Sequence, residues 1–277
     1  MTDIDVDSST DTLRFGGINR LYGNDAAQIL ANAHLCVIGI GGVGSWTAEA
    51  LARSGVGQLT LIDLDDICVT NTNRQIHATA DTIGQDKTAV MAERIRAINP
   101  ACQVNCIEDF VTEETQAEYL LAGFDCVIDA IDSVNAKTAM IAFCKRNKIP
   151  LITVGGAGGQ TDPRLITSGD LAKTFNDPLL AKVRNNLRRK HNFTKNTKRK
   201  FGIEAVFSEE QLVYPQADGS VCQTKAMNDG STRLDCAGGF GAATMVTATF
   251  GFIAAARAVD KVLAKARKAL LEKPTTE

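Results

Sequence analysis

Short apolar runs alternate with helical stretches through the first 154 residues of the chain. The apolar runs cover residues 35–38, 59–62, 104–107, 126–128 and 151–154, and the helical stretches between them cover 43–54, 85–98, 113–121 and 135–147. Short runs that are mostly apolar suit strands that are covered on both faces, and in parallel sheets such strands alternate with helices. The pattern predicts an α/β fold that is Rossmann-like, with a mostly parallel, doubly wound sheet.

A glycine-rich turn follows the first of these runs and opens the first helical stretch. It contains Gly39, Gly41, Gly42, Val43 and Gly44. Glycines permit the tight turn and let backbone amides approach a phosphate, while the helix N-terminus adds positive potential. Asp63 ends the second run, where a carboxylate can accept hydrogen bonds from ribose hydroxyls. The turn and the acid predict a nucleotide site, but an NAD-dependent dehydrogenase would show the same pair.

Charged and polar side chains beyond Asp63 favour ATP over a nicotinamide cofactor. They are Asp65, Asn71, Arg74, Lys87 and Asp132. A hydride-transfer site needs no extra cations beside the phosphates, whereas Arg and Lys neutralise a triphosphate and an acid holds magnesium. Each residue also has an ordinary interpretation: Arg74 as a surface ion-pair partner, Lys87 as a solvated residue and Asp132 as a helix N-cap. Their grouping at strand ends around one glycine turn favours the ATP site.

In these motifs and spacings, residues 14–150 resemble the ubiquitin-activating-enzyme-like adenylyltransferases. The resemblance implies ATP in the 39–44 turn with its ribose on Asp63. It implies that the phosphates are met by Asn71, Arg74 and Lys87, and that Asp132 lies at the magnesium and the reacting centre. It also implies a homodimer, because an arginine near the N-terminus of such enzymes reaches the partner's ATP site; Arg14 and Arg20 are the candidates. In the implied reaction a substrate carboxylate attacks the α-phosphate and forms an acyl-adenylate and pyrophosphate.

Nearly the whole chain is similar to one branch of that family, the enzymes that dehydrate threonylcarbamoyladenosine in tRNA. The segments that carry this similarity are 14–23, 69–77, 155–159, 170–174, 213–216 and 235–244. The similarity implies that ATP adenylates the threonyl carboxylate of a modified adenosine next to the anticodon. A nitrogen or oxygen of the same side chain then closes a ring and releases AMP. The similarity also suggests a cysteine desulfurase partner.

The alternative function is activation of the C-terminal glycine of a ubiquitin-like sulfur carrier. Enzymes that activate such carriers usually bear two C-x-x-C pairs for structural zinc, and this sequence has no such pair. We therefore expect no zinc, and we favour the tRNA substrate.

A basic segment at residues 182–200 gives a chain of net charge −2 a local surface for a phosphate backbone. Its cations are Lys182, Arg184, Arg188, Arg189, Lys190, Lys195, Lys198, Arg199 and Lys200. Phe193 and Phe201 are candidates for stacking on bases, provided that they are exposed. A second candidate surface lies near the C-terminus, at Lys261, Lys265, Arg267 and Lys268. The alternative interpretation is a solvated basic loop, or a helix end whose cations complement the helix dipole.

We divide the chain of 277 residues into three parts. Residues 1–13, with four Asp, are expected to form a loose acidic lead, residues 14–154 the ATP-binding core, and residues 155–277 a C-terminal extension that completes the sheet. The glycine run 155–159 is interpreted as a flexible connector. Residues 236–256 carry no charge, but their Gly and Ala content favours a buried helix at about 242–256 over a membrane span. A basic helix is expected to follow it.

The eight cysteines and three histidines show no metal-ligand spacing. The absence of a C-x-x-C pair and of a secretory signal favours a reducing cytoplasm. Cys222 and Cys236 lie outside the core and are candidates for a covalent step. Ring closure does not require such a step, because the attacking group belongs to the substrate. His77 is either a phosphate contact or an ordinary loop residue.

Overall fold

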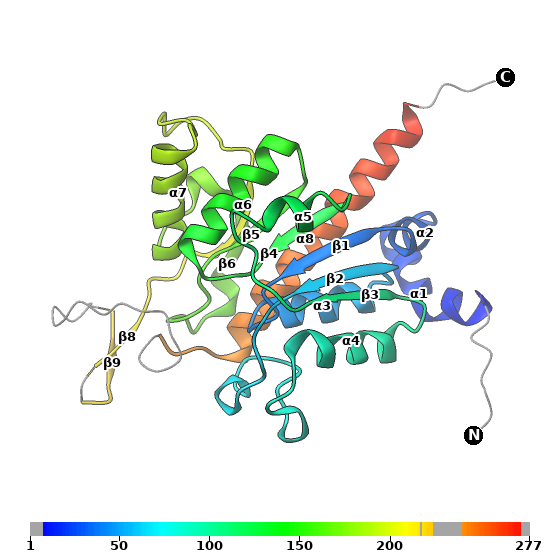
Figure 1. Ribbon diagram of the computed structural model, residues 1–277, viewed down its shortest axis with the longest axis horizontal. Coiled ribbons are helices and arrows are strands. Elements are labelled where there is room, and N and C mark those ends of the chain that lie inside the picture. The colour runs from blue at the N-terminus through cyan, green and yellow to red at the C-terminus, as the bar shows by residue number, and fades with distance from the viewer. Residues whose placement is uncertain (1–7, 217, 224–239, 273–277) are drawn as a thin grey trace.

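The computed structural model describes residues 8–216, 218–223 and 240–272 (Figure 1). A sheet of seven strands runs through it in the order β3-β2-β1-β4-β5-β7-β6, and only the pairing of β6 with β7 is antiparallel. The strands are β1 (His34–Ile38), β2 (Gln58–Ile62), β3 (Gln103–Ile107), β4 (Cys126–Asp129), β5 (Leu151–Val154), β6 (Ile166–Asp170) and β7 (Glu204–Ser208). The predicted fold class is confirmed, and each predicted strand lies within one residue of its observed ends.

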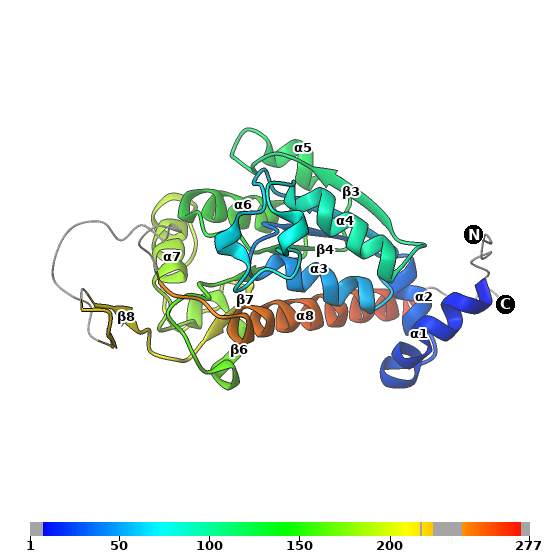
Figure 2. The same ribbon diagram turned by 90° about the horizontal axis from the view of Figure 1, so that it is seen from below.

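Helices cover both faces of the sheet. They are α1 (Ser8–Tyr22), α2 (Ala26–Ala31), α3 (Gly44–Arg53), α4 (Lys87–Ile98), α5 (Gln116–Leu120), α6 (Val134–Asn147), α7 (Pro178–Lys190) and α8 (Thr244–Leu271). Helices α3, α4 and α8 bury one apolar cluster against the sheet, and α5, α6 and α7 bury a second cluster on the opposite face (Figure 2). A short ribbon of β8 (Tyr214–Pro215) and β9 (Val221–Cys222) stands apart from the sheet.

Strand β3 departs from the expectation of a sheet that is covered everywhere. Strand β3 forms one of the two edges of the sheet, and none of its five residues is buried. Gln103 and Asn105 alternate with apolar residues along it, a pattern typical of a strand with one solvated face. The strands that are buried along nearly their whole length are β1, β2, β4, β5 and β7.

The apolar and basic stretches near the C-terminus form one helix, so the predicted division after residue 256 is wrong. Helix α8 runs without a break through 28 residues. One face, with Val246, Phe250, Ala254 and Ala258, packs into the core, and the charged residues of the second half continue on the other faces. None of the described helices is long and apolar enough to cross a membrane.

Two further expectations about local order are wrong. Helix α1 begins at Ser8, so residues 8–13 are helical and do not belong to a loose lead. The glycine run 155–159 is no flexible connector, because several of its amides are held by other segments. The Gly155 amide donates to the Val206 carbonyl and the Gly159 amide to the Gly241 carbonyl, each at 2.8 Å.

Candidate active site

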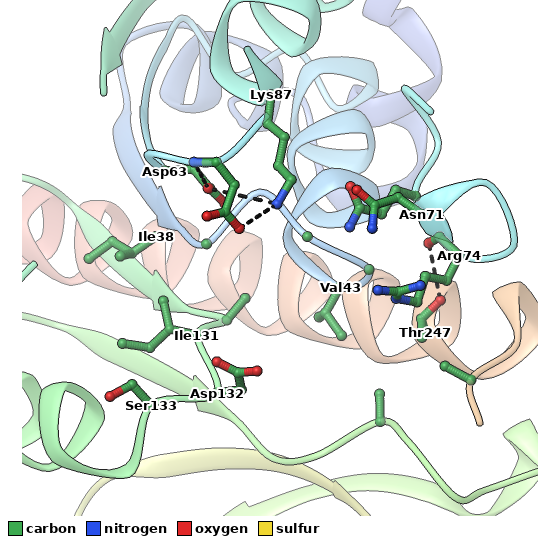
Figure 3. A pocket seen from close by; sticks show the side chains of 18 of the residues that line it. Ile38, Val43, Asp63, Asn71, Arg74, Lys87, Ile131, Asp132, Ser133 and Thr247 are labelled. Carbon is green, nitrogen blue, oxygen red and sulfur yellow. Dashed lines mark hydrogen bonds and ion pairs between the residues drawn. The ribbon is translucent and has the colours of Figure 1, made fainter. Parts of the chain in front are cut away.

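A cavity of about 1250 Å³ opens at the carboxyl ends of β1, β2, β4 and β5 (Figure 3). Strands β1 and β4 are neighbours whose connections leave in opposite directions along the sheet, and ligands of open α/β sheets bind at such switch points. All the predicted nucleotide residues except Gly44 line this cavity: Gly39, Gly41, Gly42, Val43, Asp63, Asp65, Asn71, Arg74, Lys87 and Asp132. The fold thus brings together residues that follow β1, β2 and β4 with the loop of Asn71 and Arg74 and the start of α4 at Lys87.

The glycine turn is shaped by two close approaches of its own backbone. Gly39 has a φ of +86°, a conformation that L side chains rarely adopt. A Cβ on Gly44 would lie 1.8 Å from the Gly39 carbonyl oxygen, so the turn closes only with glycine at this position. Gly44 therefore stands behind the cavity wall, where it begins α3. The helix N-terminus and the amides of the turn are then available to an anion.

Asp63 is the best-supported carboxylate of the cavity. Its Oδ2 accepts a hydrogen bond from the Ile40 amide at 2.6 Å, and its Oδ1 accepts one from the Asp65 amide at 2.9 Å. The ammonium of Lys87 lies 3.9 Å from Asp63 and 2.7 Å from Asp65. Burial raises the pKa of Asp63, and Lys87 and the two amides offset part of that rise. The arrangement fixes an acceptor and a cation side by side.

Arg74 is fixed by its backbone and by its side chain. Its carbonyl oxygen accepts from Trp46 Nε1 on α3 at 3.0 Å and from Thr247 Oγ1 on α8 at 3.3 Å. Its guanidinium donates to the Thr70 carbonyl at 2.7 Å. The aliphatic stem lies over Gly42, whose Cβ, if present, would be 3.2 Å from the Arg74 Cγ. A side chain at Gly42 would therefore displace this cation from the glycine turn.

Asp132 lies on the loop between β4 and α6, and its carboxylate points into the cavity (Figure 3). It is exposed, and it makes no hydrogen bond with another residue of the described ranges. The helix that follows starts at Val134 with Ser133 as its N-cap residue, so the N-cap interpretation of Asp132 is wrong. The carboxylate is therefore free for a ligand.

A fully buried ion pair supports the loop that carries Asp132. Lys137 Nζ lies 2.7 Å from Asp129 Oδ1, and neither side chain is exposed. The same ammonium reaches Thr153 on β5 at 3.2 Å, and the Thr153 hydroxyl donates to Asp129 Oδ2 at 2.7 Å. Asp129 Oδ1 also accepts from the Ile131 amide. These contacts join the ends of β4 and β5 directly beneath the cavity, and sequence reasoning missed them.

The sequence analysis also missed the wall of the cavity beyond β5. Gly155, Gly156, Ala157 and Gly158 line it, together with Leu179, Phe240, Gly241 and Ala242. Asp177, which caps α7, is buried and accepts from the Gly156 amide at 3.0 Å. The glycine run was visible as a motif, but its role depends on contacts with residues distant in the chain.

Arg14 and Arg20 lie outside the cavity of their own chain. Both belong to α1, which packs at the far end of the sheet from the cavity (Figures 1 and 2). Arg14 donates to the Ile98 carbonyl at the end of α4 at 2.9 Å, while Arg20 is exposed.

The structure divides the basic segment 182–200 into two groups. Arg184 donates to the Thr174 hydroxyl, and Arg188 stacks on the ring of Phe201 with 5.2 Å to the centroid. The other seven cations are exposed: Lys182, Arg189, Lys190, Lys195, Lys198, Arg199 and Lys200. Phe201 is buried and packs edge-on against the partly buried Phe193, so the prediction that Phe201 stacks on bases is wrong.

The cations of α8 are engaged within the chain. Lys261 pairs with Glu204, Lys265 with Asp125 and Arg267 with Asp25, each within 3.0 Å. Lys268 faces Glu272 at 3.7 Å. These pairs argue against a second RNA surface at this helix.

The remaining candidates lie away from the cavity or outside the described ranges. His77 is buried in a loop and does not line the cavity, which supports the ordinary loop interpretation over the phosphate contact. Cys222 is half-buried on β9, and Cys236 falls outside the described residues. Among the residues that the structure describes, no three His, Cys, Asp or Glu side chains are grouped to hold a metal ion.

A doubly wound sheet with a polar, cation-bearing cavity at its switch point defines a nucleotide-binding α/β enzyme. The chain belongs to the ThiF family, whose sequence profile matches residues 17–276. The resemblance inferred from the motifs is thereby confirmed.

Within this family the chain is most usefully compared with individual relatives of known name. The chain is 61% identical over 255 residues to the tRNA threonylcarbamoyladenosine dehydratase of Escherichia coli K12, with 92% of this chain and 95% of the relative covered. It is also similar to the crystal structure of the E. coli tRNA N6-threonylcarbamoyladenosine dehydratase in complex with ATP. There the TM-score is 0.84 at 54% identity, over 96% of this chain and 99% of the other. The molybdopterin-synthase adenylyltransferase of Salmonella typhimurium is 32% identical, but only 49% of this chain is covered.

Proposed function

We propose that this chain is an ATP-dependent tRNA threonylcarbamoyladenosine dehydratase. The observation that carries the proposal is the 61% identity to an enzyme of that name across nearly the full length of both chains. The likeness to an ATP complex at 54% identity supports ATP as the nucleotide. The similarity to a sulfur-carrier adenylyltransferase covers only about half of this chain, which disfavours the alternative function.

In the proposed site the nucleotide lies across the glycine turn. Asp63 accepts from the ribose hydroxyls, because its carboxylate is fixed by two backbone amides beside the turn. The phosphates meet the turn amides and the cations of Lys87 and Arg74, while Asn71 contributes its amide group. These groups are held before ATP arrives, so little reorganisation is needed when charge develops.

Asp132 fits a magnesium ion that binds together with the phosphates. Its carboxylate is exposed to the cavity and is not hydrogen-bonded to another described side chain. Magnesium in nucleotide sites is held by one or two carboxylates and by phosphate oxygens, so the lack of a protein metal cage is consistent with this role. When bound, the ion supplies positive charge that stabilises the phosphates during transfer.

The reaction has two steps whose atoms balance. First, a threonyl carboxylate oxygen attacks the α-phosphorus of ATP, and pyrophosphate leaves. Then a nitrogen or oxygen of the same side chain attacks the activated carbonyl carbon, loses its proton, and expels AMP with the carboxylate oxygen. The nucleoside loses one water in total. The protein orients the carboxylate and neutralises charge, and no covalent cysteine step is required.

The seven exposed cations of the 182–200 segment are the proposed contact with the tRNA backbone. Three of them, Lys182, Arg189 and Lys190, lie on α7, and the N-terminal end of this helix carries Leu179 into the cavity. A backbone bound along this helix would therefore pass close to the reacting centre. We further propose a homodimer in which Arg14 or Arg20 reaches the partner's cavity. A cysteine desulfurase partner stays a prediction of the resemblance.

The test is a dehydration assay on tRNA that carries threonylcarbamoyladenosine. The purified chain is incubated with this tRNA, ATP and magnesium, and the digested nucleosides are weighed. We expect loss of one water from the modified nucleoside, with AMP formed in equal amount. An unchanged nucleoside from a preparation that binds ATP, with AMP transfer to the C-terminal glycine of a ubiquitin-like carrier, would establish the alternative function instead.

A further inference from the structure

The cavity continues past the nucleotide residues to a wall that has almost no side chains. Gly155, Gly156, Ala157 and Gly158 form it, and the ring of Phe240 lies at its edge. The nucleotide end already offers apolar residues to the adenine of ATP, among them Val111 and Ile131. The glycine wall follows β5, and Asp132 follows β4, which lies between β5 and β1 in the sheet. The glycine turn and Asp63 follow β1 and β2, so the glycine wall lies on the side of the cavity away from them.

Phe240 is held in one position by the glycines beneath it. A Cβ on Gly158 would lie 2.9 Å from the Phe240 Cβ, and a Cβ on Gly159 would lie 2.7 Å from the ring Cδ1. Tyr214 supports the ring from another direction, with 5.1 Å between the centroids. The two glycines are thus required by the aromatic ring rather than by a phosphate.

Hydrogen bonds join three segments that are distant in the chain around this ring. The Gly159 amide donates to the Gly241 carbonyl, and the Val213 amide donates to the Gly159 carbonyl, each at 2.8 Å. Gly159 has a φ of +74°, which favours glycine. The backbone that directly follows Phe240 is therefore anchored, and the ring itself is half-buried.

We propose that Phe240 and the glycine wall form the subsite for the modified adenine base of the tRNA, an inference that rests on the proposed function. An enzyme that reacts with a group on a base takes the nucleotide out of the stack and reads it against aromatic side chains. The wall leaves room for a planar base, and Phe240 offers it a stacking surface. The threonylcarbamoyl group on N6 then extends from this subsite toward Asp132 and the α-phosphate.

The test compares Phe240→Leu with Phe240→Tyr, because leucine keeps an apolar side chain against Gly158 but removes the aromatic face. Phe175→Leu is the matched control, since Phe175 is an exposed aromatic residue that does not line the cavity. The KM for the modified tRNA, the KM for ATP and the melting temperature are measured for each variant. We expect Phe240→Leu to raise the KM for tRNA about tenfold or more, the size of a lost base–aromatic stack. The KM for ATP should stay unchanged, and Phe175→Leu should behave as the parent chain does. Phe240→Tyr, which keeps an aromatic face, should raise the KM for tRNA less than Phe240→Leu does.

A second measurement does not depend on the leucine variant folding. Phe240→Trp places a fluorophore in the subsite, and free threonylcarbamoyladenosine nucleoside should quench it, whereas free threonine should not. The proposal is overturned when the nucleoside leaves this fluorescence unchanged, or when Phe240→Leu folds and keeps the parent KM for tRNA. If the parent chain does not dehydrate the tRNA at all, the proposed function fails, and that result is distinct from an active parent with an unaffected Phe240→Leu variant.

Discussion

Cations are held in two different ways in the two functional regions of this molecule. In the nucleotide cavity, Lys87 is buried and lies 2.7 Å from Asp65, and Arg74 is bound to a backbone carbonyl. On α7, Lys182, Arg189 and Lys190 are exposed and form no ion pair within the described part of the chain. The first arrangement fixes charge in the proposed ATP site, and the second leaves charge adaptable on the proposed tRNA surface.

The same contrast runs through the basic segment itself. Arg184 and Arg188 carry positive charge but serve the fold, because they bind Thr174 and cover Phe201. Lys182 and Arg189 of the same helix are instead exposed to solvent. Position on a helix face therefore decides whether a cation belongs to the core or to the proposed RNA surface. The following predictions separate these roles, from the largest effect to the smallest.

Asp132→Ala should lower the rate of adenylation by about a thousandfold, the size that removing one preorganised electrostatic group reaches. The melting temperature should not change, because Asp132 is exposed and makes no hydrogen bond with another described residue. Single-turnover formation of pyrophosphate measures the rate, and Glu113→Gln, an exposed acid outside the cavity, is the control. A variant that unfolds instead would assign Asp132 to the fold.

Lys137→Met should mainly lower the free energy of unfolding, whereas Asp132→Ala should mainly lower the rate of adenylation. Removing one partner of a buried ion pair leaves the Asp129 charge without compensation, at a cost of about 3–5 kcal/mol. Denaturant unfolding measures this loss of free energy. The double variant Lys137→Met with Asp129→Asn should recover much of it. Equal instability of the single and double variants would contradict the ion-pair account.

His77 should make the chain sensitive to acid. Burial lowers its pKa to about 4, with help from the charges of Lys87 and Arg94. The unfolded chain takes up this proton near the ordinary value of 6.5, whereas the folded chain does not. Stability is therefore unaffected above about pH 7 and falls by about 3 kcal/mol between pH 6.5 and pH 4. His77→Phe should remove this part of the pH dependence, as unfolding at a series of pH values would reveal.

Arg189→Glu with Lys190→Glu should weaken tRNA binding about tenfold and reduce its dependence on salt, because phosphate contacts release counterions. ATP binding and the melting temperature should stay as in the parent chain. Arg188→Glu should instead lower the melting temperature, since it removes the cation from the face of Phe201. If Arg188→Glu left the fold intact and weakened tRNA binding as much as the double variant, the division of the basic segment would be wrong.

The predictable part of the molecule is the part whose residues lie next to strand ends. Asp63 follows β2 and Asp132 follows β4, and parallel strands bring their carboxyl ends to one edge. The point at which each apolar run ends was therefore enough to place these two side chains in one cavity. Glycine spacing added the conformation of the turn at Gly39 and Gly44.

The remaining part depends on contacts between distant residues, which local pattern does not encode. Gly159 meets Gly241 across 82 positions of sequence, and Arg188 meets a phenylalanine that is buried for reasons unrelated to its own segment. The course of α8 was misjudged because its charges, which suggested a separate element, are neutralised by Asp25, Asp125 and Glu204 from other parts of the fold.

The most direct test of the central claim, that one cavity activates a carboxylate and releases AMP from it, follows a single oxygen atom. A tRNA whose threonyl carboxylate carries a heavy isotope at both oxygens is converted in one turnover, and the AMP, the pyrophosphate and the nucleoside are weighed. The account predicts one heavy oxygen in AMP, none in pyrophosphate, and the other retained in the cyclised base. Unlabelled AMP beside a dehydrated nucleoside would contradict it, because the carboxylate would then have been activated in some other way.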